Sequence, residues 1–587
     1  MRVKSIFPGL GLLLLTVGTS LCQADTVLVT NINGYTLDSQ KQLHQFVALQ
    51  IEDDRVTRRF SANETLPANV DRVVDGNGAT LLPGLIDAHG HVLGYGLSQL
   101  RVDLIGARSE QEAVDRVLAF AAENPDVAWI QGRGWNQVLW DSNAFPTASS
   151  LDAALAEANI NKPVWLTRVD GHAGWANSAA MELAGITADS TDPDGGQIIR
   201  YGADDGTGSG ASGNSRNSRN PRNSRNTSVP VASANTPTGV LVDNAMDLLE
   251  AQIPPITQSE RKLALVAAMQ GLAAYGLTSA HDAGVGSATI AAYKELINDG
   301  PLPIRVNVML AATDNNYEQH LAAGHFRSAD DTLTINSVKI AADGALGSRG
   351  AALIEDYSDL PGHRGLLLHT AERLEYFMRA AMNAGFQVAT HAIGDDANRL
   401  VLNHYQQLIT ETNTHALRHR IEHAQVLQLE DITRFTELGV IPSMQATHAT
   451  SDKNMAQDRL GEVRVQGAYA WRKLLDTGAI IANGSDFPVE SPNPFFGLHA
   501  SITRQDHNNE PPGGWFPNER MTVQEALASF TIDAAYTGHQ ENLLGTLEPG
   551  MKADFILIDR DIFTINPSTI WQTQVQQTWV NGQQVYP

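Results

Sequence analysis

The chain has 587 residues, of which 42% are hydrophobic and 18% are charged, and its formal net charge at pH 7 is −24. This length and composition predict a globular protein with a large core and roughly two to four domains. The acidic balance argues against nucleic acid as a partner, because phosphate backbones bind basic surfaces.

Residues 1–24 have the pattern of a secretory signal peptide. Basic Arg2 and Lys4 precede an apolar run of about a dozen residues, and the small residue Ala24 marks the expected cleavage site. The run is shorter than the roughly 20 residues that span a bilayer, and no later stretch of that length is uniformly apolar. We therefore expect export, to the periplasm, with no transmembrane segment.

The only cysteine, Cys22, lies in this leader. A lipid anchor would make Cys22 the first mature residue, but the bulky Leu21 before it fits that pattern poorly, so we favour export without an anchor. A mature chain without cysteine has no disulfide and no thiolate, so any metal must be held by nitrogen and oxygen.

Residues 25–82 and 543–587 contain short alternating runs such as VLVTNING and ADFILIDRDIF. These runs are typical of antiparallel strands. The simplest arrangement is one small β-sandwich domain formed from both chain ends, with residues 83–542 inserted between its two parts.

Residues 83–542 repeat one unit, in which a helix ends at a glycine and an apolar strand follows at once. The four glycines are Gly276, Gly385, Gly439 and Gly478. Repeated βα units predict an α/β fold, either a (β/α)8 TIM-like barrel or an open doubly wound sheet. The absence of a GxGxxG motif after a first strand favours the barrel.

The segment at about 201–237 is almost free of large apolar residues and carries an Asn-Ser-Arg repeat. It cannot bury enough surface to offset the entropy of ordering, so we expect a disordered insertion. Its arginines could contact an acidic partner, although a solvated linker is the simpler interpretation.

Two histidines stand one residue apart in GLIDAHGHV, where an apolar strand ends. Residues two apart on a strand point to the same face, so His89 and His91 can share one cation. Alone, this pair is weak evidence. His391, His423 and Asp486 also stand where an apolar run gives way to a polar turn. The carboxyl ends of parallel barrel strands form one rim, so the five side chains predict a nitrogen and oxygen metal site there.

Lys339 stands between Val338 and Ile340 in a strand-like run. If its neighbours pack against helices, the lysine must point into the barrel. A buried, unpaired ammonium beside cations is strongly unfavourable, so we expect Lys339 to be neutral or converted into an anion.

The HxH motif, the strand lysine, the two further strand-end histidines and the late aspartate together resemble the amidohydrolase superfamily. The longer motifs around them resemble its amidohydrolase-3 branch, which includes N-substituted formamide deformylases. The resemblance covers nearly the whole mature chain except the Asn-Ser-Arg insertion. The matching phrases are LLPGLIDAHGHV, PVWLTRVDGHAGWANSAAMELAGI, VKIAADGALGSRGAAL, THAIGDDAN, RIEHAQ, RLGEVRVQGAYAWRKLLDTG, ANGSDFPVESPNP and LGTLEPGMKADFILID.

The resemblance implies a metal-dependent hydrolase. It implies that His89, His91 and Asp486 bind one divalent metal, that His391 and His423 bind a second, and that Lys339 is N6-carboxylated and bridges them. Zinc is the default for such ligands, iron and manganese are accepted by the same set, and one or two ions remain open. Metal-activated hydroxide would attack a carbonyl, and Asp486 would act as proton shuttle.

Residues on loops expected above the barrel are candidate substrate contacts, with packing as the alternative for each tryptophan. They are Trp135, Asn136, Asp170, His172, Trp175 and Arg349, with His281, His363 and His448 as weaker candidates.

We expect an exported metal-dependent hydrolase that cleaves a carbon–nitrogen bond other than a peptide bond, in a small-molecule amide such as an N-substituted formamide or N-acyl amine. The alternatives are the same site acting on cyclic amides or esters or as a deaminase, and a periplasmic metal- or ligand-binding protein without catalysis. A monomer and a homo-oligomer both remain open.

Overall fold

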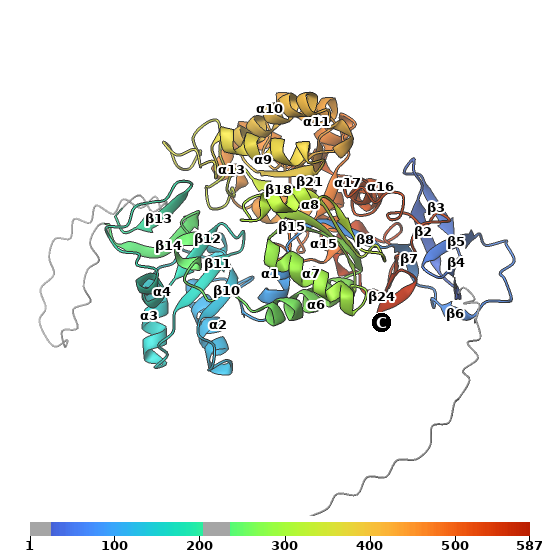
Figure 1. Cartoon of the computed structure of the whole chain (residues 1–587), viewed down its shortest axis with the longest axis horizontal. Coiled ribbons are helices and arrows are strands. Elements are labelled where there is room, and N and C mark those ends of the chain that lie inside the picture. Colours follow the sequence, from blue (N-terminus) through green and yellow to red (C-terminus); the bar gives the residue numbers. More distant parts are fainter. Residues whose placement is uncertain (1–24, 203–234) are drawn as a thin grey trace, which may run out of the picture.

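The computed structural model describes residues 25–202 and 235–587 (Figure 1). The predicted signal peptide at 1–24, with Cys22, lies outside the described residues, and so does nearly all of the predicted insertion at about 201–237. Across the two described ranges, no helix has the length and apolar character needed to cross a membrane.

The largest sheet is a nearly closed parallel barrel, as predicted. Its eight barrel strands, in spatial order, are β8 (Leu85–Gly90), β15 (Leu277–Val285), β16 (Arg305–Ala311), β18 (Leu333–Ala341), β19 (Gln387–Ala392), β20 (Arg420–His423), β21 (Ile441–Gln445) and β22 (Ala482–Gly484). The last strand returns to the first, because the backbone N–H of Asp486 donates to the His89 carbonyl at 2.7 Å. The carboxyl ends of all eight strands therefore meet at one mouth.

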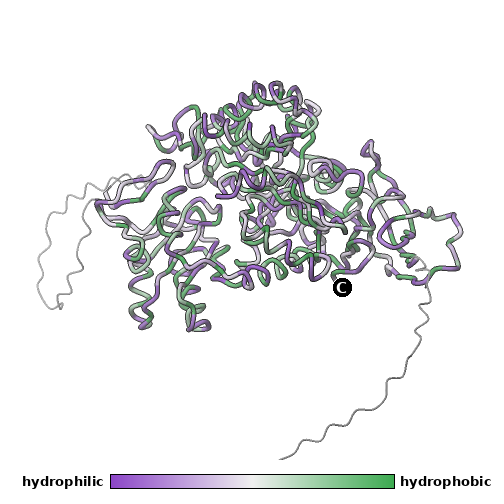
Figure 2. The backbone as a smooth tube through the Cα atoms, in the orientation of Figure 1, coloured by the Kyte–Doolittle hydropathy of each residue, from purple (hydrophilic) through white to green (hydrophobic). Residues whose placement is uncertain are grey.

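Glycines at helix ends set the phase of these units. Gly276, Gly385, Gly439 and Gly478 have φ of 84°, 81°, 66° and 89°. They follow α6 (Gln258–Ala274), α9 (Ala371–Asn383), α11 (Ile432–Leu438) and α14 (Trp471–Asp476). Because glycine adopts the left-handed region at little cost, it stops each helix and turns the chain back into the barrel. Figure 2 shows hydrophobic and hydrophilic residues alternating along the outer helices, which is typical of helices with one buried face.

Strands from both chain ends form the expected β-sandwich. One sheet has the order β5 (Arg55–Phe60), β4 (Ala48–Glu52), β1 (Thr26–Thr30), β6 (Arg72–Asp75). The other has the order β25 (Gln583–Tyr586), β24 (Val575–Val580), β23 (Phe555–Ile558), β7 (Thr80–Pro83), β2 (Asn33–Leu37), β3 (Leu43–Phe46). Val29 and Leu49 from the first sheet share one buried cluster with Leu81, Phe555 and Trp579 from the second. The two sheets therefore pack face to face.

A third, six-stranded sheet separates the first barrel unit from the second. Its order is β13 (Gly196–Arg200), β14 (Pro237–Asp243), β12 (Ala173–Ala176), β11 (Val164–Arg168), β10 (Ile130–Trp135), β9 (Val102–Asp103). It carries helices of its own, among them α2 (Glu110–Glu123) and α3 (Ala148–Glu157), and lies beside the barrel in Figure 1. The strands of this sheet stand where the sequence predicts loops above the barrel.

Candidate metal centre

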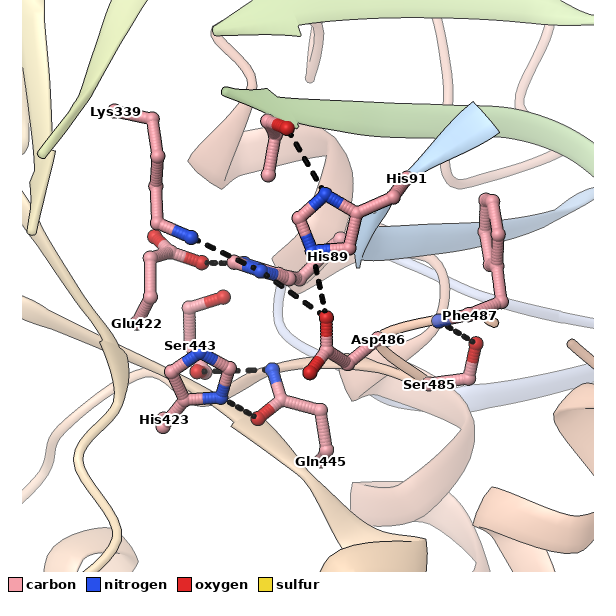
Figure 3. Close-up of polar contacts among 12 residues, drawn as sticks. His89, His91, Lys339, Glu422, His423, Ser443, Gln445, Ser485, Asp486 and Phe487 are labelled. Carbon is pink, nitrogen blue, oxygen red and sulfur yellow. Dashed lines mark hydrogen bonds and ion pairs between the residues drawn. The ribbon is translucent and has the colours of Figure 1, made fainter. Parts of the chain in front are cut away.

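The histidine pair and the late aspartate meet at the mouth of the barrel. His89 lies near the end of β8, and His91 directly precedes α1 (Val92–Ser98). The Nε2 atoms of His91 and His89 lie 3.0 and 3.5 Å from Oδ1 of Asp486 (Figure 3). Three donor atoms from two distant parts of the chain thus lie within 4.8 Å of one another, close enough to bind one ion.

Three histidines share one arrangement, in which Nδ1 bonds to the protein and leaves Nε2 for the site. The Nδ1 partners are the Glu422 carboxylate for His89, the Ala283 carbonyl at 3.0 Å for His91, and Oε1 of Gln445 at 2.7 Å for His423. Such outer partners fix the tautomer and ring orientation of metal-binding histidines. The donor set therefore fits a divalent metal held by imidazole nitrogen and carboxylate oxygen.

Lys339 points into the barrel, as the sequence predicts. Its neighbours Val338 and Ile340 are fully buried in the main core, and its Nζ lies 3.3 Å from Nε2 of His89. Burial lowers the pKa of Lys339, although the carboxylates of Glu422 and Asp486 oppose that shift.

His391 and His423 extend the cluster from β19 and β20. The centroid of the His423 ring lies 4.6 Å from that of His391 and 4.9 Å from that of His89. Nε2 of His391 is buried without a hydrogen-bond partner, 3.4 Å from Oδ1 of Asp343. Burial lowers the pKa of both imidazoles, which keeps them neutral and able to act as ligands.

The surroundings of Asp486 and His89 lower the pKa of both side chains. Burial opposes ionisation of Asp486, but the close approach of His91 and the other nearby imidazoles outweigh it and hold the pKa well below its usual range. Burial and the nearby Lys339 lower the pKa of His89 to about 4. Burial raises the pKa of Asp87 to about 7, and this side chain accepts bonds from the backbone N–H groups of His89 and Ser485, which tie the first strand to the last.

The backbone is strained where two site residues sit. His423 has φ 73°, Ala424 has φ 43° and Asp486 has φ 58°. Non-glycine residues occupy this left-handed region uncommonly, and they persist there where the surrounding structure holds them. Neighbouring strand residues normally face opposite sides. The turn at His423 lets Glu422 and His423 both reach the barrel interior.

Two predicted substrate contacts are wrong. Trp135 and Trp175 have no exposed surface, and both belong to the core of the third sheet. Their indole N–H groups donate to the carbonyls of Leu166 and Thr147 at 2.7 and 2.9 Å. These tryptophans stabilise the sheet and cannot contact a substrate.

Of the remaining predicted contacts, His172 lies at the cluster and the other three are held by protein groups, with Oδ1 of Asp170 accepting a bond from the His172 backbone N–H at 3.1 Å. The His172 ring lies 5.5 Å from that of His391, and its Nδ1 lies 2.7 Å from Oδ1 of Asp243. Burial opposes protonation of His172, but Asp243 outweighs it and raises the pKa to about 9. The other three bind protein groups: Asn136 and Asp170 each bind Arg168, and Arg349 pairs with Asp359.

Sequence reasoning missed Glu422, Gln445, Asp243 and Asp343, and it ranked His448 among the weaker candidates. Nε2 of His448 lies 3.8 Å from Oδ2 of Asp486. Glu422 stands beside a predicted ligand, in RIEHAQ, but strand alternation places it on the opposite face. Only the left-handed backbone at His423 reverses that expectation.

Comparisons with known proteins show which family the chain resembles. The amidohydrolase family profile matches residues 72–219 and 213–586. YtcJ of Bacillus subtilis (strain 168), which carries an amidohydrolase name, is 30% identical over 91% of this chain and 93% of its own. N-substituted formamide deformylase of Arthrobacter pascens is 25% identical over 96% and 98% of the two chains.

A solved structure is similar over nearly the whole chain as well. It is an uncharacterized metal-dependent hydrolase from Pyrococcus horikoshii OT3, and it superposes with a TM-score of 0.70 at 25% identity. The match covers 92% of this chain and 99% of that one. With the family profile spanning most of the sequence, these likenesses establish that the chain belongs to the metal-dependent amidohydrolase family.

Proposed function

We propose that the protein is an exported metal-dependent hydrolase that cleaves the carbon–nitrogen bond of a small-molecule amide other than a peptide. The observation that carries this proposal is the position of Asp486. One of its oxygens lies 3.0 and 3.5 Å from the paired imidazoles of His91 and His89, where it can act on both metal and substrate.

We assign the ligands as the sequence suggests. His89, His91 and Asp486 would hold one divalent ion, His391 and His423 would hold a second, and Lys339, if N6-carboxylated, would supply carboxylate oxygens to both. Zinc suits this set of nitrogen and oxygen donors. A bound divalent metal lowers the pKa of a coordinated water and polarises a substrate carbonyl.

Asp486 carries the proton in this scheme. Its carboxylate is ionised at neutral pH, so an oxygen not bound to metal can accept a proton from the attacking water. It then delivers that proton to the nitrogen of the leaving amine as the C–N bond breaks and the new C–O bond remains. The products are a carboxylic acid and an amine. His172, cationic beside His391, is the one predicted substrate contact that we retain, as a donor to the carbonyl oxygen.

The likeness to N-substituted formamide deformylase supports N-substituted formamides or N-acyl amines as the substrate class. The barrel fold alone does not show whether the substrate is one of these amides, a cyclic amide, an ester or a base that is deaminated. A panel of metal-loaded assays with one substrate of each class distinguishes them.

Replacing the proton shuttle tests the mechanism. The Asp486→Asn variant, under conditions in which it retains metal, is expected to lose about 10²- to 10⁴-fold in the rate of N-formyl or N-acyl amine hydrolysis. Metal content is measured on the same samples. Equal turnover by both proteins would contradict the shuttle role, and no turnover of any substrate by the native protein would favour a metal- or ligand-binding protein.

Export is a separate part of the proposal. It predicts that the protein recovered from the periplasm begins at Asp25, which N-terminal sequencing checks. An intact Met1 on periplasmic protein, or retention of all protein in the cytoplasm, would contradict it.

A further inference from the structure

His448 occupies a place at the barrel mouth that the assigned ligands do not explain. It lies on α12 (Ala446–Asp452), which begins directly after β21. The last residue of β21, Gln445, holds Nδ1 of His423, and the His448 ring stacks on the His423 ring at 5.9 Å with an interplanar angle of 20°. One short stretch of chain therefore orients two imidazoles side by side.

The free nitrogen of His448 is directed at the site. Its side chain is 11% exposed, and Nε2 is buried without a hydrogen-bond partner. A buried polar atom without a partner costs free energy and calls for an explanation. Its nearest carboxylate is Asp486, whose Oδ2 lies 3.8 Å away.

Asp486 presents its two oxygens to two different sets of nitrogens. Oδ1 faces His89 and His91, whereas Oδ2 faces His448. Donor atoms of His423, His448 and Asp486 all lie within 4.8 Å of one another, as do those of His89, His91 and Asp486. Among the described residues, only these two groups bring three such donors together this closely.

We propose that Nε2 of His448 is a further ligand of the second divalent ion, which it would hold together with His423 beside Oδ2 of Asp486. This inference rests on the proposed metal-dependent function and deepens it. Tetrahedral ligands of one zinc ion lie about 3.3 Å apart, given zinc–nitrogen distances of roughly 2.0–2.1 Å. The donor atoms of His448 and His423 lie within 4.8 Å of one another, so binding a shared ion requires only a small side-chain rotation.

Cobalt titration of the metal-free full chain tests this assignment. We compare the native protein with His448→Asn and with His404→Asn. His404 is a matched control, because its Nε2 is likewise buried without a partner but it lies on α10 (Asp395–Thr412). The His448 variant is expected to lose at least about tenfold in affinity for one equivalent of Co²⁺ and to change the cobalt absorption spectrum. His404→Asn is expected to match the native protein.

A second variant gives a positive signal. His448→Cys in a Cys22→Ser background contains one cysteine, because Cys22 is the only natural one. A thiolate ligand at position 448 is expected to produce a sulfur-to-cobalt charge-transfer band. The proposal is overturned if His448→Asn binds cobalt with native affinity and spectrum, or if the cysteine variant gives no such band.

These outcomes separate the two proposals. If His448→Asn loses cobalt affinity but the native protein hydrolyses no amide, the ligand assignment stands and the enzymatic function fails. If the native protein hydrolyses amides and His448→Asn keeps all its cobalt, the function stands and the ligand assignment fails. A native protein that binds no metal overturns both.

Discussion

Glu422 shows how one buried residue organises the centre. Its carboxylate binds Nδ1 of His89 and also accepts bonds of 2.6 and 2.9 Å from the Arg420 guanidinium. Burial opposes its charge, but Arg420 and His89 outweigh burial and keep the pKa of Glu422 below its usual range. The charged carboxylate fixes His89 with Nε2 facing the site.

Neutralising this carboxylate should weaken metal binding. We expect Glu422→Gln to reduce metal affinity by about 10- to 100-fold, because His89 loses its anionic partner. Competition with a chelator measures the change. Glu430→Gln, at an exposed carboxylate paired with Arg399, is the control and should retain native affinity. Native affinity in Glu422→Gln would refute the orienting role.

His419 should make stability depend on pH at a place away from the metal cluster. It accepts a bond from the Val388 N–H at Nδ1, and burial lowers its pKa to about 3 from 6.5. Because the folded pKa is depressed, the stabilisation is complete above pH 6.5 and is lost as pH falls toward 3. Within that window one proton changes the free energy of unfolding by up to about 1.4 kcal/mol per pH unit.

The matching variant is His419→Asn, whose Oδ1 can accept the same bond without titrating. Urea unfolding from pH 4.5 to pH 7 should show a shallower pH dependence for the variant by up to this one-proton slope. Parallel pH dependence in the two proteins would show that His419 does not contribute.

At the scale of elements, α1 links the site to the barrel wall. It begins directly after His91 and crosses α6, and a Cβ added at Gly96 would overlap the carbonyl oxygen of Ala264. Any residue larger than glycine must therefore push the two helices apart and move His91.

We expect Gly96→Ala to reduce the free energy of unfolding by about 1–3 kcal/mol and to weaken metal binding. Gly271→Ala on α6 is the control, because its nearest neighbour is the hydroxyl end of Tyr95 at 3.2 Å, which can move. Chemical denaturation and metal titration measure both effects. A Gly96→Ala variant as stable as Gly271→Ala would contradict the close helix crossing.

Elements with a strong local signal could be predicted from the sequence, and those that depend on distant contacts could not. Helix-ending glycines and strand-end polar residues predict the barrel and predict that His89, His91 and Asp486 meet, and the structure places these three side chains together. The third sheet was missed because its strands follow no repeated helix–glycine–strand unit. Its tryptophans were misplaced because a buried indole and a substrate contact have the same sequence signature.

At the scale of the whole molecule, buried charges join the sandwich to the barrel. Arg305 begins β16, at the end of the barrel opposite the site, and its guanidinium binds Asp554 through two bonds of 2.6 and 3.0 Å. Both side chains are buried. Removing one partner would leave the other charge buried and uncompensated.

We expect Asp554→Asn to destabilise the protein by about 3–5 kcal/mol while the activity per folded molecule is retained. Thermal unfolding measures the first quantity, and the rate of amide hydrolysis per folded, metal-loaded molecule measures the second. Glu64→Gln, which breaks the exposed pair with Arg58, is the control and should leave the transition unchanged. Equal stability of the two variants would contradict a structural role for the buried pair.

Anomalous diffraction at the zinc absorption edge, from crystals of the zinc-loaded protein, tests the central claim most directly. The predicted result is a peak within about 2.0–2.2 Å of Nε2 of His89, Nε2 of His91 and a carboxylate oxygen of Asp486. If the anomalous signal places zinc only elsewhere on the protein, or shows no zinc at this mouth of the barrel, the result would contradict the metal centre and the hydrolytic function that depends on it.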